Sequence, residues 1–457
     1  MYDIIIIGAG TAGIAAYKEA IKFTQNILII NDGPWDTTCA RVGCMPSKVL
    51  IASANRMHNI LHANTLGLTT DTQIDTSNVM NRVRLLRDRF TEATQKDVDR
   101  WSTEHKVSGK AHFINANTVE VNGKKYQGKS FILAVGSTPI IDTQIKAELA
   151  DRLLSSDQIF ELERLPNSLA VIGSGVIAIE LAQAMQRLGV NVDIFARSKK
   201  IGSLTSPYLQ ELAQQEISKE LNIHFEVLPD SMHRSNNRVS IEFTENNSKK
   251  YIEVDYVFTA TGRRSLLDNL NLENINSKYI NSKQLDISKY SKQLGQLPIF
   301  IVGDAYTTTP IQHEAAHEGR LAVHNCLNYP QVQNIKTLTP LSIVFSQPEM
   351  AIIGQSRKQL EQNNIEYICG YVDYQQQGRA LVMAENKGAA ELYVDKNSRQ
   401  LLGAELFVSS AEHLAHLLAW IMSEKLTIDE ILQKPFYHPT LEEGLRTALK
   451  HAKRQFK

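Results

Sequence analysis

A repeated order of apolar and small residues organises the chain. The same order occurs twice. Each copy begins with a short apolar run, continues with three small residues at fixed spacing, and ends with apolar residues at helical spacing. The positions are Ile4–Ile7 with Gly8, Gly10 and Gly13, and Ala170–Ile172 with Gly173, Gly175 and Ala178. A second apolar run follows each helical stretch, at Ile27–Ile30 and at Val190–Phe195. Two strand–helix–strand units of this kind predict two parallel sheets.

The spacing of the small residues is typical of a dinucleotide site. The first glycine permits a tight turn, the second lets a pyrophosphate approach the backbone, and the third position lets helix and strand pack closely. The pyrophosphate then lies at the positive end of the helix. One such turn is weak evidence, because it can be a tight turn without a ligand. Two copies, each between a strand and a helix, favour two Rossmann-like domains.

The chain after residue 335 has another pattern. Apolar runs at Ser342–Phe345, Ala389–Val394 and Leu401–Phe407 predict strands, a helix is expected near Glu412–Ser423, and a last helix is expected to begin at Pro439. No glycine turn of the above kind occurs there. The fold class predicted is therefore α/β, with two Rossmann-like dinucleotide-binding domains and a C-terminal α+β domain, and with boundaries near residues 145, 270 and 335.

Composition excludes several classes of protein. The 457 residues are 43% hydrophobic and 21% charged, which is typical of a globular protein. Lys plus Arg and Asp plus Glu each number 49, so no net charge favours nucleic acid or an anionic membrane. No apolar run approaches the roughly 18–20 residues of a transmembrane helix. A strand begins at once, without a basic leader, which predicts the cytoplasm, where a disulfide would be transient and catalytic.

Cys39 and Cys44 stand out among the four cysteines. Their spacing is not that of a zinc or thioredoxin-like motif, and no metal site is predicted. Five residues of regular helix rise about 7.5 Å, beyond the roughly 7 Å Cα separation that a disulfide tolerates. A bridge therefore needs a distorted turn, which Gly43 could allow; the alternative is two buried, unlinked cysteines. Cys326 and Cys369 are expected to be ordinary core thiols.

The segment TCARVGCMPSK, residues 38–48, beside a nucleotide-binding turn resembles the redox-active segment of the class I pyridine nucleotide–disulfide oxidoreductases. These are FAD enzymes that include dihydrolipoamide dehydrogenases and glutathione reductases. Five further segments occur in the family's order: FILAVGSTP (131–139), FTATGRR (258–264), IFIVGDA (299–305), FSQPEMAIIG (345–354) and YHPTLEEG (437–444). The resemblance implies an FAD-binding domain at 1–147 and 271–335, an NAD(P)-binding domain at 148–270, and an interface or dimerisation domain at 336–457.

The resemblance also implies catalytic roles. Cys44 would be the thiol next to the flavin, and Cys39 the thiol that exchanges with substrate. Lys48 would lie beside the flavin and pair with Glu180. His438 would be the acid–base residue, oriented by Glu443 and reaching across the interface of a homodimer.

Several residues are implied in FAD binding. Asp304 would hold ribityl hydroxyls, and Ala111 and Gln312 fall where family members offer backbone groups. Asn31-Asp32 stands where the family usually has Glu for the FAD ribose. Asp36-Thr37 replaces the usual Gly-Gly before Thr38-Cys39, which would add a carboxylate near the FAD phosphates.

The nicotinamide cofactor is expected to be NADP(H) rather than NAD(H). An NAD site usually ends its second strand with an acidic residue, and here Ala196 is followed by Arg197, Lys199 and Lys200. Cations would bind a 2′-phosphate that a carboxylate would repel. Ala178 as the third turn residue is similar to glutathione reductase-like NADPH sites, and Gly262 is a further candidate by resemblance. The alternative is a solvated basic loop.

The function predicted is an FAD-dependent oxidoreductase that passes electrons between NAD(P)H and a small disulfide or dithiol through Cys39 and Cys44. Two alternatives stay open, a flavoprotein reductase of metal ions or quinones and a non-catalytic flavin redox sensor.

Overall fold

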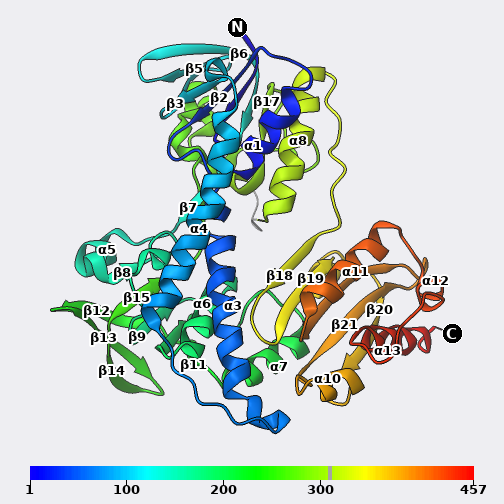
Figure 1. Cartoon of the computed structure of the whole chain (residues 1–457). Helices are drawn as coiled ribbons and strands as arrows, with labels where there is room; N and C mark the ends of the chain where they lie inside the picture. The colour runs from blue at the N-terminus through cyan, green and yellow to red at the C-terminus, as the bar shows by residue number, and fades with distance from the viewer. Residues whose placement is uncertain (307–310, 457) are drawn as a thin grey trace. The chain divides into compact units, whose positions relative to one another are not determined.

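The computed structural model describes residues 1–306 and 311–456. The chain divides into two compact units, each made of three segments (Figure 1). The first unit comprises residues 1–46, 82–140 and 262–337, and the second comprises residues 47–81, 141–261 and 338–457.

The first unit is built on a sheet with parallel strands at its centre. Its order is β3 (Lys106–Ser108), β2 (Ile27–Asn31), β1 (Tyr2–Ile7), β6 (Lys124–Leu133), β5 (Thr118–Val121) and β4 (His112–Asn115), and β17 (Ile299–Ile301) pairs with β6. Strand β1 runs parallel to β2, as a strand–helix–strand connection requires, and it also runs parallel to β6. Residues Ile4–Ile7 are buried, as central parallel strands covered on both faces should be. Helices α1 (Thr11–Ala20) and α8 (Gln312–Asn328) pack together in this unit.

The second unit contains the other Rossmann-like sheet. Its parallel strands follow the order β11 (Asn222–Phe225), β10 (Asn191–Ala196), β9 (Ser168–Ile172), β15 (Tyr256–Thr259) and β8 (Leu153–Leu154). Helix α6 (Val176–Arg187) follows the second glycine turn and connects β9 to β10. A small antiparallel sheet of β12 (Pro229–Ser235), β13 (Arg238–Glu245) and β14 (Ser248–Val254) belongs to the same unit (Figure 1).

Two long helices have residues in both units. Helix α3 (Cys44–Leu61) begins in the first unit and continues into the second, and α4 (Thr76–Asp99) returns the chain to the first. Cys44 and Lys48 therefore lie on one continuous helix, one turn apart.

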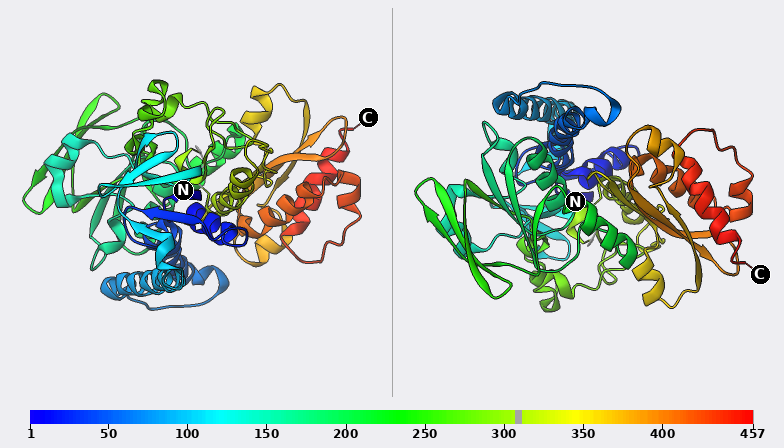
Figure 2. Two further views of the ribbon diagram at one scale, coloured as in Figure 1. Left: turned by 90° about the horizontal axis from the view of Figure 1, so that it is seen from above. Right: turned by 90° about the horizontal axis from the view of Figure 1, so that it is seen from below.

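The C-terminal part of the second unit is α+β, as predicted. Its antiparallel sheet has the order β18 (Leu341–Val344), β19 (Glu349–Gly354), β22 (Leu401–Val408), β21 (Gly388–Asp395) and β20 (Tyr367–Asp373). Alternate residues of β21 and β22 form one core with α11 (Ala411–Ser423) and α13 (Glu442–Lys453), so both helices cover the same face (Figure 2).

One helix boundary differs from the prediction. The last helix begins at Glu442 rather than at Pro439. Residues 437–440 form a turn in which the Thr440 hydroxyl donates to the carbonyl oxygen of Tyr437. Proline at the first helical position is a common pattern, but this local hydrogen bond delays the helix by three residues.

Within residues 1–306 and 311–456, none of the helices is both long and apolar enough to cross a membrane.

Candidate active site

The first glycine turn has the geometry of a pyrophosphate cradle. Gly8 has φ +103°, and a Cβ added there would lie 2.3 Å from the carbonyl oxygen of Ala134. A Cβ on Gly13 would lie 1.8 Å from the carbonyl oxygen of Gly8, so helix and strand pack in direct contact. A Cβ on Gly10 would meet nothing within 4 Å. The tight turn, the close packing and the open backbone thus occur at the three positions that a dinucleotide site needs.

The second turn repeats this geometry. Gly173 has φ +117° and would place a Cβ 2.6 Å from the carbonyl oxygen of Ala260, while Gly175 again faces open space. Ala178 is fully buried in α6. Among the described residues no side chain caps the N-terminus of α1 or α6. Both helix ends can therefore offer backbone N–H groups to phosphate oxygens.

Asn31, expected to contact the FAD ribose, has its amide engaged within the protein. Its Oδ1 accepts the N–H of Ala9 at 2.9 Å, and its Nδ2 donates to the carbonyl oxygens of Gly33 and Pro34 at 3.1 and 2.9 Å. Asn31 thus fastens the first glycine turn to the end of β2. Asp32 is exposed immediately after that strand, which makes it the better candidate for ribose hydroxyls.

The cysteine segment is a helix broken between its two cysteines. A short helix, α2 (Thr38–Arg41), ends before Gly43, and α3 begins at Cys44. A Cβ on Gly43 would lie 3.2 Å from the Cα of Cys39, so the turn folds back on the first cysteine. The predicted distortion at Gly43 is present. Cys39 is half-buried and Cys44 is exposed, unlike the alternative of two buried cysteines.

The two residues that replace the family's Gly-Gly have structural roles in this loop. Asp36 has a side chain only 2% exposed, and its Oδ1 accepts from Nε of Arg41 at 2.9 Å. Thr37 caps α2 by accepting the N–H of Ala40. The carboxylate added before the cysteines is thus balanced by a cation from the same loop, and sequence reasoning had missed that partner.

Arg41→Ala is expected to destabilise the protein by about 2–3 kcal/mol, because it leaves the buried Asp36 carboxylate without its cation. Denaturant unfolding measures this loss. Lys96→Ala is the matched control, since Lys96 pairs with Glu92 on an exposed helix face and such pairs contribute well under about 1 kcal/mol. Equal losses in the two variants would contradict a structural role for the Asp36–Arg41 pair.

Lys48 and Glu180, predicted to pair, lie in direct contact. The Nζ of Lys48 is 2.8 Å from Oε2 of Glu180, whose side chain is 5% exposed. The other carboxylate oxygen accepts the N–H of Phe345 at 2.9 Å, and Nζ of Lys48 lies 4.5 Å from the Phe345 ring centroid. The buried carboxylate is thus bonded at both oxygens, as burial of a charge requires.

His438 and Glu443 also form the predicted pair. The Nδ1 of His438 lies 3.0 Å from Oε2 of Glu443, and the N–H of Thr440 donates to the same oxygen at 3.2 Å. The Thr440 N–H and His438 lower the pKa of Glu443, which therefore stays a carboxylate at neutral pH. This carboxylate orients Nδ1 and leaves Nε2 to exchange a proton with another group.

The histidine borders a surface pocket. The side chain of His438 is 82% exposed, and the neighbouring pocket encloses about 520 Å³. Its lining residues are Arg379, Met383, Ser410, His413, Leu414, Tyr437, Pro439, Thr440, Leu441 and Glu442. The imidazole is therefore accessible from outside its own chain, as the predicted role across a subunit interface requires.

The predicted basic loop is attached to the second glycine turn. Arg197 directly follows β10, and both it and Lys199 are exposed. The hydroxyl of Ser174 donates to the carbonyl oxygen of Lys200 at 2.6 Å, which brings the loop to the turn. Nζ of Lys199 lies 3.8 Å from a carboxylate oxygen of Glu226. Ser174 is a positioning residue that sequence reasoning had missed.

The remaining FAD candidates lie in the first unit. Asp304 lies in the short helix Gly303–Ala305 directly after β17, where burial raises its pKa while Arg263 opposes that shift. Gln312 is the first residue of α8, and Ala111 is buried just before β4. Gly262, the further candidate for the nicotinamide cofactor, has φ +128°, a conformation that favours glycine.

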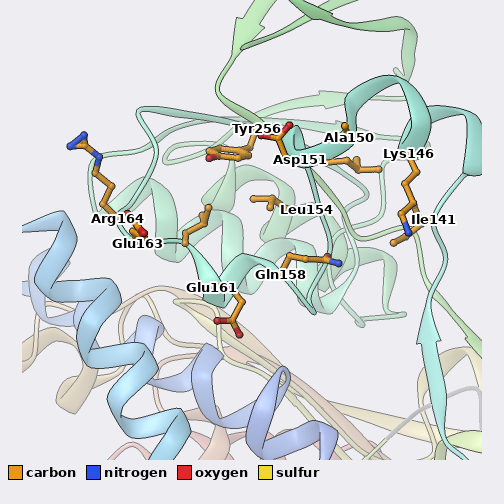
Figure 3. Close-up of a pocket in the computed structure, with 12 residues that line it drawn as sticks. Ile141, Lys146, Ala150, Asp151, Leu154, Gln158, Glu161, Glu163, Arg164 and Tyr256 are labelled. Atoms are coloured by element: carbon orange, nitrogen blue, oxygen red, sulfur yellow. The ribbon is translucent and has the colours of Figure 1, made fainter. Parts of the chain in front are cut away.

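Another pocket lies apart from the predicted residues. It encloses about 590 Å³ and is lined by twelve residues, among them Tyr256, Leu154, Lys146, Glu161 and Arg164 (Figure 3). None of the predicted site residues lines it, and its charged side chains carry both signs. It is therefore not the candidate active site.

Comparison with known proteins agrees with this geometry. Residues 2–319 match the family described as pyridine nucleotide-disulphide oxidoreductase, and residues 341–449 match its dimerisation domain. The chain belongs to the pyridine nucleotide–disulfide oxidoreductase family. The predicted fold class and the predicted function, an FAD-dependent disulfide oxidoreductase that uses a pyridine nucleotide, are confirmed at this level. The second match supports the predicted homodimer.

Individual relatives are distant. The chain is 28% identical over 448 residues to a dihydrolipoyl dehydrogenase of Geobacillus stearothermophilus, covering 96% of this chain and 94% of that protein. It is 26% identical over 450 residues to a mercuric reductase of Lysinibacillus sphaericus, covering 98% and 82%. Among solved structures, LpdA from Mycobacterium tuberculosis has a TM-score of 0.84 at 19% identity, with 99% of each chain covered. The HOCl-induced flavoprotein disulfide reductase RclA from Escherichia coli has a TM-score of 0.81 at 18% identity, with 100% of each chain covered.

Proposed function

We propose that this enzyme reduces a small disulfide with NADPH, and oxidises the corresponding dithiol in the reverse direction. The observation that carries the proposal is the broken helix at Cys39–Cys44, continued one turn further by Lys48, which is bonded to the buried Glu180. When bound at the first glycine turn, FAD supplies the two-electron chemistry that connects the nicotinamide to the disulfide. The overall reaction takes NADPH, one proton and a disulfide to NADP⁺ and two thiols.

Cys39 and Cys44 together carry out the thiol–disulfide exchange that reduces the substrate. In the reduced enzyme the Cys39 thiolate attacks one sulfur of the substrate, forms a mixed disulfide and expels the first thiolate. His438 of the partner subunit gives that leaving group a proton, after having taken the proton of Cys39. Cys44 then attacks the sulfur of Cys39, which re-forms the Cys39–Cys44 disulfide and releases the second thiolate. A proton from solvent completes the second thiol.

Each charged pair supports one part of this cycle. Lys48 places a positive charge one turn along α3 from Cys44, which favours the thiolate form of that cysteine. Glu180, bonded to Lys48 and to the N–H of Phe345, fixes the position of that charge. Glu443 stabilises the charged imidazole that His438 becomes between the two proton transfers.

An anaerobic titration tests this function directly. We expect NADPH to reduce the flavin and then to produce the long-wavelength absorbance of a thiolate beside oxidised flavin. A panel of lipoamide, oxidised glutathione, Hg²⁺ and a quinone then identifies the acceptor. Turnover of Hg²⁺ or the quinone alone would contradict a disulfide substrate and favour the metal-ion or quinone reductase. This thiol chemistry needs a reducing compartment, so the cytoplasm remains the predicted location.

Preference for NADPH over NADH is proposed from the loop after β10. Arg197 is exposed there, and Ser174 fastens the loop to the glycine turn. A guanidinium binds a phosphate through two parallel hydrogen bonds, and no carboxylate ends β10 to repel the phosphate.

Arg197→Glu is expected to lower kcat/KM for NADPH by about tenfold or more, since a charge-assisted hydrogen bond contributes about 1.5–3 kcal/mol. The value for NADH should stay within about threefold, because NADH has no 2′-phosphate. Steady-state kinetics with both nucleotides at low ionic strength measures the ratio. A wild-type enzyme that prefers NADH, or an equal loss with both nucleotides, would contradict the NADP(H) assignment.

A further inference from the structure

Helix α6 carries a row of buried polar side chains that ordinary packing does not need. Gln183 follows Glu180 by three residues and Arg187 follows Glu180 by seven, so the three side chains share one face of the helix. All three are buried. Burying a guanidinium costs free energy unless its N–H groups are hydrogen-bonded. The hydrogen-bond partners of these three side chains therefore indicate which segments they hold in place.

Arg187 has partners on three different segments. Its Nε and one terminal nitrogen donate to the two carboxylate oxygens of Glu220, at 2.5 and 3.0 Å. The other terminal nitrogen donates to Oδ1 of Asn55 on α3 at 2.7 Å and to Oε1 of Gln347 at 2.8 Å. Burial and the charge of Arg187 lower the pKa of the neighbouring His58 to about 4, so His58 is neutral at neutral pH and does not compete for Glu220.

The contacts tie α3 to α6 at two points. Glu180 binds Lys48, and Arg187 binds Asn55. Asn55 follows Lys48 by seven residues on α3, and Arg187 follows Glu180 by seven residues on α6, so the helices run in the same direction with matched register. Figure 1 shows α3 beside α6. Seven residues correspond to about 10 Å of helix, and a helix held at two points that far apart can neither slide nor rotate.

The same row also holds the segment that contacts Lys48. The N–H of Phe345 donates to Glu180, the N–H of Gln347 donates to Oε1 of Gln183, and the amide of Gln183 donates to the carbonyl oxygen of Gln347. Arg187 completes this set through the side chain of Gln347. The Phe345 ring therefore stays next to Nζ of Lys48 because the row holds the backbone on either side of it.

We propose that Arg187 is a positioning residue for catalysis: through Asn55 and Gln347 it sets the register that brings Lys48 onto Glu180. This inference rests on the proposed role of Lys48 beside Cys44. Arg187 acts through other residues and is not itself a catalytic group. Lysine cannot replace it, since the forked guanidinium serves Glu220, Asn55 and Gln347 at once.

Two variants and one matched control test this role. Arg187→Lys keeps the charge and loses the fork, and Asn55→Ala removes only the tie to α3. Gln186→Ala is the control, because Gln186 lies on the same helix and accepts the N–H of Val192 outside the row. For each holoenzyme we measure kcat and KM with the best disulfide, the thermal midpoint, and the distance between Nζ of Lys48 and Oε2 of Glu180 in a crystal structure.

We expect Arg187→Lys and Asn55→Ala to lower kcat by on the order of tenfold, with KM within about twofold, because small misplacements of catalytic groups have effects of this size. The Lys48–Glu180 distance should exceed hydrogen-bond range in both. Gln186→Ala should keep kcat and the 2.8 Å contact even if it lowers the midpoint as much. The inference is overturned if the contact stays at 2.8 Å in both variants, or if the control loses kcat equally.

Lys48→Met separates this inference from the proposed function. If Lys48→Met keeps full kcat, Lys48 has no role in the reaction, and the proposed role of Lys48 beside Cys44 is wrong. The crystallographic distance in Arg187→Lys still tests whether Arg187 sets the register. A slow Lys48→Met enzyme beside an unaffected Arg187→Lys enzyme would refute the positioning role alone.

Discussion

Cys39→Ser is expected to abolish disulfide turnover, by on the order of a thousandfold or more, while NADPH still reduces the flavin at the normal rate. A serine hydroxyl is a much weaker nucleophile than a thiolate and cannot form the mixed disulfide. Cys44 is not expected to take over, because its proposed place is next to the flavin, where it would hold the thiolate and not exchange with substrate. Stopped-flow absorbance follows flavin reduction, and a coupled assay follows the disulfide.

A second signature accompanies that loss. In the Cys39→Ser protein, Cys44 has lost its proposed disulfide partner. The Cys44 thiolate should therefore produce the long-wavelength band before any reductant is added. Cys369→Ala is the matched control: burial raises the pKa of Cys369 to about 12, so it is not a thiolate at neutral pH and its loss should leave turnover within about twofold. A Cys39→Ser protein that still reduced disulfides would show that another residue performs the exchange.

The parts of the fold that the sequence predicted are those with local causes. Buried apolar runs form the predicted strands, and the close contact of Gly13 with Gly8 lies within a single motif. Gly8 and Gly173 contact the distant Ala134 and Ala260, but the spacing of the small residues was enough to predict both turns. His438 and Glu443 are five residues apart, so their contact needs only the local chain. The pairing of Lys48 with Glu180 is not local, and it was predicted by resemblance alone.

The sequence did not predict contacts for which several side chains of the chain could serve equally well as hydrogen-bond or ion-pair partners. Asp36 could be recognised as an added carboxylate, but only the folded loop shows that Arg41 neutralises it. Asn31 has the right chemistry for a ribose, yet the folded chain uses its amide to fasten the first glycine turn. In the sequence, Arg187 is simply an arginine near the end of a predicted helix. Its proposed role follows only from its contacts with Asn55 and Gln347 in the folded chain.

His438→Gln is expected to lower disulfide turnover by about 10²- to 10⁴-fold at neutral pH, the usual contribution of a positioned acid–base group. The deficit should shrink as pH rises toward about 8.5, where a thiol ionises without help. Flavin reduction by NADPH should be unchanged. His413→Gln is the matched control, because His413 lines the pocket that His438 borders and lies 3.6 Å from a carboxylate oxygen of Glu412, and this variant should remain active.

Mixed dimers show which chain supplies the histidine. When inactive Cys39→Ser and His438→Gln chains are unfolded and refolded together, about half of the dimers contain one chain of each kind. If His438 acts across the interface, each mixed dimer has one intact site, made of Cys39 from one chain and His438 from the other, and about a quarter of all sites recover activity. If His438 acted on its own chain, no site in the mixture would be complete and activity would stay absent. Recovery near one quarter thus supports the assignment across the interface that the exposed imidazole suggests, and no recovery would place the acid–base step within one subunit.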